Sequence, residues 1–164
     1  MKRVLIFCTA ALMMLACKKE DCSTPSFTVD QQQLADDIIL IDQYLADNGI
    51  TAEVHNTGIR YEIVKPGTGI KPDNCSKVYV RYRGEFLDGT IFEETPLNTP
   101  LPEFVLGSLV SGWQVGIPLI KEQGEINLYI PSGYAYGPTG SGSTIPANTP
   151  LIFNIELFGV VNPL

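Results

Sequence analysis

Few residues of this chain have side chains suited to acid–base, nucleophilic or metal chemistry. It contains one histidine, His55, which excludes a multi-histidine metal site and argues against a Ser-His-Asp triad. The four cysteines show no CxxC spacing, so a zinc ribbon is excluded. Ser141 lies between two glycines but lacks the flanking residues of a GxSxG turn, and no glycine-rich stretch has the lysine of a phosphate-binding loop. The sequence predicts no metal and no cofactor.

Aromatic side chains are the more unusual feature of the region after residue 57. For any one of them, a place in a hydrophobic core is the strongest interpretation. Their order along the chain and the short strings around them are more specific than that. The set comprises Tyr82, Phe92, Phe104, Trp113, Tyr134, Tyr136 and Phe153.

The elements that must position these rings follow from the spacing of apolar residues. Alternation with period two predicts strands at 59–63, 78–82, 126–130 and 151–157, with a short apolar strand at 104–107. One short helix is expected over 113–120, and residues 132–150 are expected to form a loop rich in Gly, Ser and Pro. This is an α+β pattern, a half-buried antiparallel sheet covered by one helix.

Residues 28–50 carry the pattern of one N-terminal helix. Thr28 or Asp30 can cap its start, and Gly49 lies where helix ends favour glycine. The aspartates of this segment, Asp37 among them, are expected largely outside its apolar stripe. Such a helix either packs on the following domain or forms a dimer interface, and packing is favoured because short helices are marginal without tertiary contacts. The stripe consists of Leu34, Ile38, Ile41 and Leu45.

Length and composition fit one domain with a segment or two to spare. The chain has 164 residues, of which 45% are hydrophobic and 18% charged, so it can fill a core and is not disordered by composition. Its formal net charge of −7 gives no electrostatic reason to bind DNA, RNA or an anionic lipid surface. Nucleic acid is therefore not an expected partner.

The first sixteen residues have the pattern of a secretory signal peptide. Two positive charges precede an apolar run over residues 4–16, which is too short to span a bilayer as a helix. The run ends at Cys17 and then turns polar, which resembles the lipobox of bacterial lipoproteins, where the cysteine is acylated. Residues 17–27 would then be a lipid-attached tether, with the bilayer as a partner. The expected location is the bacterial cell envelope, in the periplasm or at the outer-membrane surface.

Processing would change the cysteine count. Cys8 would leave with the signal peptide and Cys17 would carry lipid, so Cys22 and Cys75 would remain in an oxidising compartment. We predict that these two cysteines form a disulfide with each other. Two free thiols are the alternative, and the sequence alone does not decide between the two states.

The order of the aromatic strings identifies a family. Residues 57–161 resemble the FKBP-type peptidyl-prolyl cis-trans isomerases, and the combination is more specific than any single string. In order, the strings are 80–84 (VRYRG), 88–93 (DGTIFE), 104–107 (FVLG), 112–113 (GW), 130–137 (IPSGYAYG), 145–146 (IP) and 151–157 (LIFNIEL).

The resemblance implies a strongly bent antiparallel sheet wrapped around one short helix. A substrate proline would lie in an apolar pocket between the two, so proline-containing polypeptides are the implied partners. Trp113, at the start of the helix, would form the pocket floor. The walls would be Tyr82, Phe92, Phe104 and Phe153.

The resemblance also assigns the mouth of this pocket. Leu109 and Val110 would line it, and the Val110 backbone N–H would hold a substrate carbonyl. Tyr136 would offer its hydroxyl to a second carbonyl, and Ile145 would close the rim. Glu93 would take the position of a carboxylate near the twisting amide.

The chain departs from the family pattern at the pocket rim. Glu93 replaces the usual Asp, Pro102 replaces a common rim aromatic, and Asn98 takes the place of an Arg that pairs with that Asp. The segment 107–113 is shorter than in many members, and Ser141 lies where bulkier residues often occur. A longer carboxylate without a cation tends to turn toward water, so Glu93 is expected to point partly outward and to leave a wetter pocket edge.

Three functions from different classes remain at this point. The first is a lipid-anchored prolyl isomerase that assists the folding of exported proteins. The second is a binding or chaperone module that holds proline segments in the same pocket with little turnover. The third, an inert structural lipoprotein, leaves the aromatic order unexplained. The retained pocket aromatics favour the isomerase, whereas the altered rim is compatible with the binding module.

Overall fold

The computed structural model describes residues 22–23 and 26–163. The expected signal peptide, Cys17 and most of the tether lie outside the described residues. No helix in the described part is long and apolar enough to cross a membrane.

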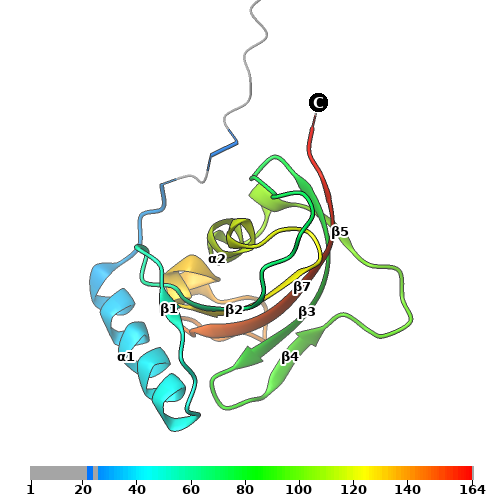
Figure 1. Ribbon diagram of the computed structural model, residues 1–164. Coiled ribbons are helices and arrows are strands. Elements are labelled where there is room, and N and C mark those ends of the chain that lie inside the picture. The colour runs from blue at the N-terminus through cyan, green and yellow to red at the C-terminus, as the bar shows by residue number, and fades with distance from the viewer. Residues whose placement is uncertain (1–21, 24–25, 164) are drawn as a thin grey trace, which may run out of the picture.

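A single antiparallel sheet forms the body of the protein, and it curves around a short helix (Figure 1). Its strand order is β1-β2-β6-β7-β3-β4, and β5 pairs with β3 beyond the end of β4. The strands are β1 (Glu53–Val54), β2 (Arg60–Lys65), β3 (Lys77–Phe86), β4 (Ile91–Glu94), β5 (Glu103–Val105), β6 (Gly124–Ile130) and β7 (Leu151–Val161).

The helix α2 (Ser111–Gly116) lies in the hollow of the sheet and continues as the 3₁₀ turn η2 (Ile117–Leu119). The expected helix over 113–120 is therefore split, because Pro118 lacks the N–H that an α-helix would use. Two glycines let α2 approach β6 closely. A Cβ atom would lie 2.5 Å from Ile130 at Gly112 and 2.5 Å from Leu128 at Gly116.

The core fills the space between α2 and the concave face of the sheet. Alternate residues of the long strands point into it, as the period-two pattern predicted. Its fully buried members include Val78, Val80, Ile126, Leu128, Ile130, Leu151, Ile155 and Leu157.

The helix α1 (Gln31–Asp47) packs against the outer face of the sheet, next to β1 and β2 in Figure 1. Asp30 caps its start by accepting a hydrogen bond from the Gln33 N–H at 2.8 Å. Ile41 and Leu45 form a second apolar cluster with Tyr129 and Ile152, which alternate with the core residues of β6 and β7. The helix thus packs on the domain, the alternative that the sequence favoured.

Polar contacts also join α1 to the domain. Arg60 of β2 donates from Nε and Nη2 to the two carboxylate oxygens of Asp42, both at 2.8 Å. Asp37, which was expected largely outside the packing stripe, is instead fully buried. The expectation was wrong because Asp37 faces backbone and hydroxyl donors of the domain, which stabilise a carboxylate without a cation.

Two elements between β6 and β7 lie in the segment expected to be loop. They are the 3₁₀ turns η3 (Ser132–Tyr134) and η4 (Gly137–Thr139), followed by an isolated bridge between Ser141 and Ile145. The strand β1 was not predicted, because two exposed residues carry no period-two signal. Residues 95–102 connect β4 to β5.

Candidate active site

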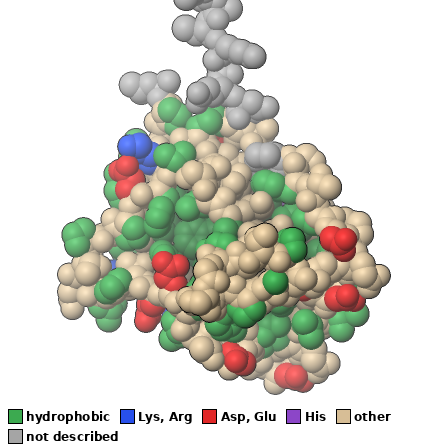
Figure 2. Space-filling model, turned by 180° about the vertical axis from the view of Figure 1, so that it is seen from behind, with side chains coloured by type: hydrophobic (Ala, Val, Ile, Leu, Met, Phe, Trp, Pro, Cys, Tyr) green, Lys and Arg blue, Asp and Glu red, His purple; other side chains and the backbone are tan. Residues whose placement is uncertain are grey.

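A cavity of about 220 Å³ opens between α2 and the concave face of the sheet. Figure 2 shows a hollow lined by hydrophobic side chains on the face opposite the view of Figure 1. One carboxylate belongs to its wall. The lining residues are Tyr82, Glu93, Phe104, Leu109, Val110, Trp113, Tyr136 and Phe153.

Trp113 forms the centre of the aromatic wall. Its ring centroid lies 5.0 Å from that of Tyr82, 5.3 Å from that of Phe153 and 6.4 Å from that of Phe104, each in an edge-to-face arrangement. Such pairs stabilise one another beyond the area that they bury. Trp113 is only 4% exposed and Phe153 only 3%, so this part of the wall is shielded from solvent.

Phe92 supports this wall from behind and is not among the residues that line the cavity. Its ring packs edge-on against Phe153, with centroids 5.7 Å apart. Gly84 of β3 makes room for it, since a Cβ atom there would lie 2.5 Å from the Phe92 ring. The expected wall position of Phe92 is therefore corrected to a place behind Phe153.

The mouth of the cavity is built by the turn before α2. Gln114 donates from Nε2 to the carbonyl oxygens of Leu109 (2.7 Å) and Gly107 (3.1 Å), which fixes the backbone of this turn. Within the described part of the chain, the N–H of Val110 donates no hydrogen bond. This donor therefore remains available to a substrate carbonyl.

Glu93 and two tyrosine hydroxyls form the polar side of the mouth. Burial first, and a hydrogen bond to the Glu93 carboxylate second, raise the pKa of Tyr82. Burial first, and the charge of the Glu93 carboxylate second, raise the pKa of Tyr136. Both hydroxyls therefore stay protonated at neutral pH and can donate hydrogen bonds.

Glu93 combines two features, exposure to water and a place in the cavity wall. The residue is exposed, which agrees with a carboxylate turned partly to water. It nevertheless lines the cavity and acts on both hydroxyls. The pairing of Glu93 with Gly84, and the hydrogen bond from the Tyr82 N–H to Thr95 Oγ1 (3.2 Å), hold β4 at this place.

Ile145 lies in a different place from the one expected. It is 6% exposed, belongs to the main core and does not line the cavity. Its backbone pairs with that of Ser141 in both directions, at 2.9 and 3.1 Å, which draws the residue inward. The expected rim position of Ile145 is thus corrected.

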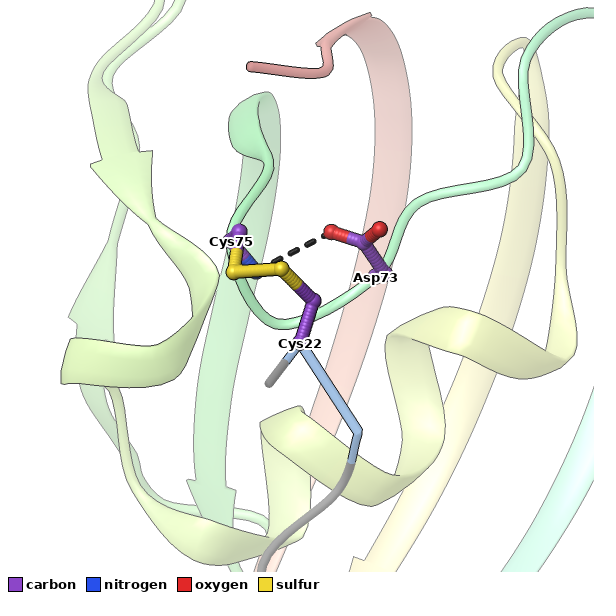
Figure 3. Close-up of side chains that lie close together, drawn as sticks. All are labelled: Cys22, Asp73 and Cys75. Carbon is purple, nitrogen blue, oxygen red and sulfur yellow. Dashed lines mark hydrogen bonds between the residues drawn. A yellow bond between two sulfur atoms is a disulfide. The ribbon is translucent and has the colours of Figure 1, made fainter. Parts of the chain in front are cut away.

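Cys22 and Cys75 meet before the start of β3 (Figure 3). Cys22 and Cys75 form a disulfide with Cα atoms 5.2 Å apart, and Asp73 Oδ1 accepts a hydrogen bond from the Cys75 N–H. The backbone carbonyl oxygen of the adjacent Asn74 accepts a hydrogen bond from the Gly107 N–H at 2.8 Å. The three side chains at 22, 73 and 75 lie close enough to suggest metal ligands, but the disulfide leaves no free thiolate for a metal.

Residues 68–158, more than half of the chain, match the family model of the FKBP-type peptidyl-prolyl cis-trans isomerases. The chain belongs to this family. The matched residues include β3 to β6, most of β7, α2 and every residue that lines the cavity, whereas β1 and β2 precede them.

Individual relatives agree with this membership. A probable FKBP-type peptidyl-prolyl cis-trans isomerase FkpA of Neisseria meningitidis is 36% identical over 122 residues, which make up 73% of this chain and 45% of that protein. The crystal structure of a peptidyl-prolyl cis-trans isomerase from Pseudomonas syringae is 33% identical, with a TM-score of 0.69, and the match covers 84% of this chain and 100% of that one. The structure of FkpA from Escherichia coli is 30% identical, with a TM-score of 0.70, and the match covers 80% of this chain and 62% of that one.

These matches confirm the predicted fold. The FKBP-like α+β architecture, an antiparallel sheet around a short helix, is shared with the solved structures. The chain spans less than half the length of the Neisseria relative, so the comparison concerns the FKBP domain and the segment next to it.

Two supporting residues of the site were missed by sequence reasoning. Gln114 was not singled out, although a polar residue directly after Trp113 in a short buried helix is a signal for a local backbone contact. Thr95 was not singled out either, and its role depends on the register between β3 and β4, for which the sequence has no short-range signal.

Proposed function

We propose that this FKBP-family protein catalyses the cis–trans isomerisation of Xaa-Pro bonds in exported polypeptides. The observation that carries the proposal is the cavity, which combines an apolar aromatic wall around Trp113 with free hydrogen-bond donors at its mouth. A proline ring is apolar and compact, and its flanking carbonyls need donors. The cavity offers both kinds of contact to one dipeptide.

The chemistry requires no proton transfer and no covalent bond. An Xaa-Pro bond isomerises unaided in about tens to hundreds of seconds, because amide resonance imposes a barrier on the order of 18–20 kcal/mol. Twisting the bond localises the nitrogen lone pair and reduces charge separation. An apolar site therefore stabilises the twisted amide relative to the planar one, and an acceleration of about a thousandfold needs only about 4 kcal/mol.

Each part of the mouth has a role in this proposal. The Val110 N–H and the Tyr136 hydroxyl hold the carbonyl groups on either side of the proline, which keeps the peptide in the twisted geometry. Glu93 sets the charge at the edge, and Tyr82 closes the wall beneath it. Phe92 supports the wall through Phe153, and Ile145 supports the loop from the core.

A second candidate function is the binding of proline segments with little turnover. Its supporting observation is the rim, where Pro102 replaces an aromatic residue and does not line the cavity. An open rim would weaken binding of the twisted transition state more than binding of the planar ground state.

One experiment separates the two functions. The cis-to-trans rate of a chromogenic peptide with a central proline is measured against protein concentration, and binding of the same peptide is followed by fluorescence of Trp113, the only tryptophan of the chain. We expect a rate that rises linearly with protein. Binding without acceleration would overturn the isomerase in favour of the binding module, and neither signal would overturn both.

We further propose that the protein is anchored in the cell envelope through an acylated Cys17. Support comes from the apolar run that ends at this cysteine and from the disulfide, which persists in oxidising compartments. More than one acyl chain would be needed for a stable anchor. Replacing Cys17 by Ala should release the processed protein from the membrane fraction. A processed Cys17→Ala protein that stays in that fraction would contradict the anchor.

A further inference from the structure

Asp37 of the N-terminal helix connects that helix to the loop that carries Tyr136. The carboxylate is fully buried. Its Oδ2 accepts hydrogen bonds from the backbone N–H of Ser132 at 2.7 Å and from the Ser132 hydroxyl at 2.6 Å, and its Oδ1 accepts one from Gln33 Nε2 at 2.8 Å. Because a backbone donor is involved, the carboxylate fixes the main chain at Ser132 and not only a side chain.

Two further contacts join the same two segments. The Phe27 ring meets the Tyr134 ring edge-on, with centroids 6.2 Å apart. Val29 lies so close to Gly133 that a Cβ atom there would be 3.0 Å from its Cγ1. In Figure 1 the turn η3 accordingly lies between α1 and α2. The N-terminal segment therefore touches three consecutive residues of the loop, and Asp37 makes the polar contact among them.

The path from this contact to the cavity is short. Ser132 starts η3, and its carbonyl oxygen accepts the Ala135 N–H at 2.9 Å. Tyr136 follows directly and lines the cavity. In the described part of the chain, its hydroxyl has no hydrogen-bond partner that could hold it in place independently. The main-chain position at Ser132 therefore contributes to where this hydroxyl lies, together with the Asn148 N–H, which donates to the Gly137 carbonyl at 2.8 Å on the other side of Tyr136.

We propose that Asp37 is a positioning residue of the isomerase site, which acts by fixing Ser132 and thereby the Tyr136 hydroxyl. The N-terminal helix is then a working part of the catalytic unit rather than only a spacer. The activity readout of this inference rests on the proposed isomerase function.

The test uses two matched substitutions on one helix, in the full chain. Asp37→Asn removes the charge of the acceptor and weakens the contact to Ser132, whereas Asp42→Asn removes the ion pair with Arg60, which is remote from the Tyr136 loop. Both are assayed at a temperature at which circular dichroism shows them folded. We expect Asp37→Asn to lower kcat/KM by roughly fourfold, no more than removal of the Tyr136 hydroxyl itself would, and Asp42→Asn to change it by less than about twofold. Equal losses in the two variants would overturn the proposal.

A second background separates positioning from general stability. In a Tyr136→Phe protein the hydroxyl is absent, so Asp37→Asn should lower kcat/KM no further. An additive loss would show that Asp37 acts by another route and would overturn the proposal. If Asp37→Asn does not fold, Ser132→Ala takes its place, because it removes one donor and leaves the carboxylate otherwise bonded. A smaller loss is then expected, again absent in the Tyr136→Phe background.

A readout independent of catalysis separates this inference from the proposed function. Amide hydrogen exchange of residues 134–140 should be faster in Asp37→Asn than in Asp42→Asn. A wild-type protein without isomerase activity would overturn the proposed function and leave this comparison intact. Equal exchange in the two variants would overturn the positioning role.

Discussion

We call Trp113 and Phe153, two buried rings of the aromatic wall, the floor of the cavity. Both are almost fully buried, and their rings contact each other edge-to-face. At the mouth of the cavity, Val110 and Tyr136 belong to turns, are partly exposed and carry donors without partners in the described chain. The floor is thus part of the hydrophobic core, whereas the mouth depends on contacts from other segments. Those contacts come from Gln114 and, at a greater distance along the chain, from Asp37.

The contrast between a buried floor and a partly exposed mouth predicts that substitutions in the two regions have different effects. A floor residue contributes to folding and to the apolar environment of the twisted amide, so a change there affects both. A mouth residue mainly orients the peptide, and its neighbours can compensate in part. We therefore expect floor substitutions to be more damaging than mouth substitutions, and the following predictions test that order.

The largest expected effect concerns the disulfide between Cys22 and Cys75. Cys22 and Cys75 are 53 residues apart, so loss of the bridge in a Cys22→Ser/Cys75→Ser variant should lower the free energy of unfolding by about 4 kcal/mol through chain entropy. Urea unfolding of the two proteins measures it. The kcat/KM of the folded variant should fall by less than that of a floor variant. A free-thiol assay that finds both cysteines reduced in the native protein would contradict the bridge.

Trp113→Leu tests the floor itself. The substitution keeps an apolar side chain but removes the flat ring against which Tyr82, Phe104 and Phe153 pack. We expect kcat/KM to fall by about tenfold or more, equivalent to at least about 1.4 kcal/mol of transition-state stabilisation. The peptide assay on protein shown to be folded gives the value, and an unchanged kcat/KM would refute the role of the floor.

Tyr136→Phe tests the mouth. It removes one hydroxyl donor and leaves the ring, so the expected loss in kcat/KM is roughly fivefold, the equivalent of one hydrogen bond of about 1 kcal/mol. Tyr134→Phe is the matched control, because the Tyr134 ring contacts Phe27 and its hydroxyl does not line the cavity. Equal losses in the two variants would mean that the hydroxyl at position 136 has no special role.

The smallest expected effect is a dependence of stability on alkaline pH. Burial and Glu93 raise the pKa of Tyr82, and burial first raises the pKa of Tyr129 to about 12. Above pH of about 10, the unfolded chain releases these protons while the native chain keeps them, so the unfolded state binds fewer protons and the free energy of unfolding falls as pH rises.

This contribution to stability is fully present below pH of about 10 and is lost above it. Urea unfolding at a series of pH values measures the slope, which should be shallower in a Tyr82→Phe variant. A slope that Tyr82→Phe leaves unchanged would show that the wall tyrosine does not contribute.

The sequence predicted the parts of the fold that repeat locally. Alternation located β2, β3, β6 and β7, and one of the two predicted capping residues, Asp30, caps the start of α1. The split of α2 could be anticipated from Pro118, because a proline within a short helix removes a donor. The set of wall residues followed from the family strings rather than from periodicity.

The sequence failed where a residue depends on a distant partner. Asp37 looked like one more solvent-facing aspartate, and its partner Ser132 is 95 residues away. Its position four residues before Ile41, on the inner side of the helix, was the available signal. Phe92 and Ile145 were assigned to the right region, but ring packing over Gly84 and the backbone bridge to Ser141 place them behind the cavity.

The most direct test of the central claim compares one floor and one mouth substitution on the same proline peptide. Glu93→Gln removes the charge at the mouth, and Phe153→Ala removes a ring that contacts both Trp113 and Phe92. At a temperature at which both variants are folded, we expect kcat/KM to change by only about threefold in Glu93→Gln and to fall by about tenfold or more in Phe153→Ala. If Glu93→Gln is the more damaging of the two, the carboxylate and not the apolar wall governs turnover, and the account of the site given above is wrong.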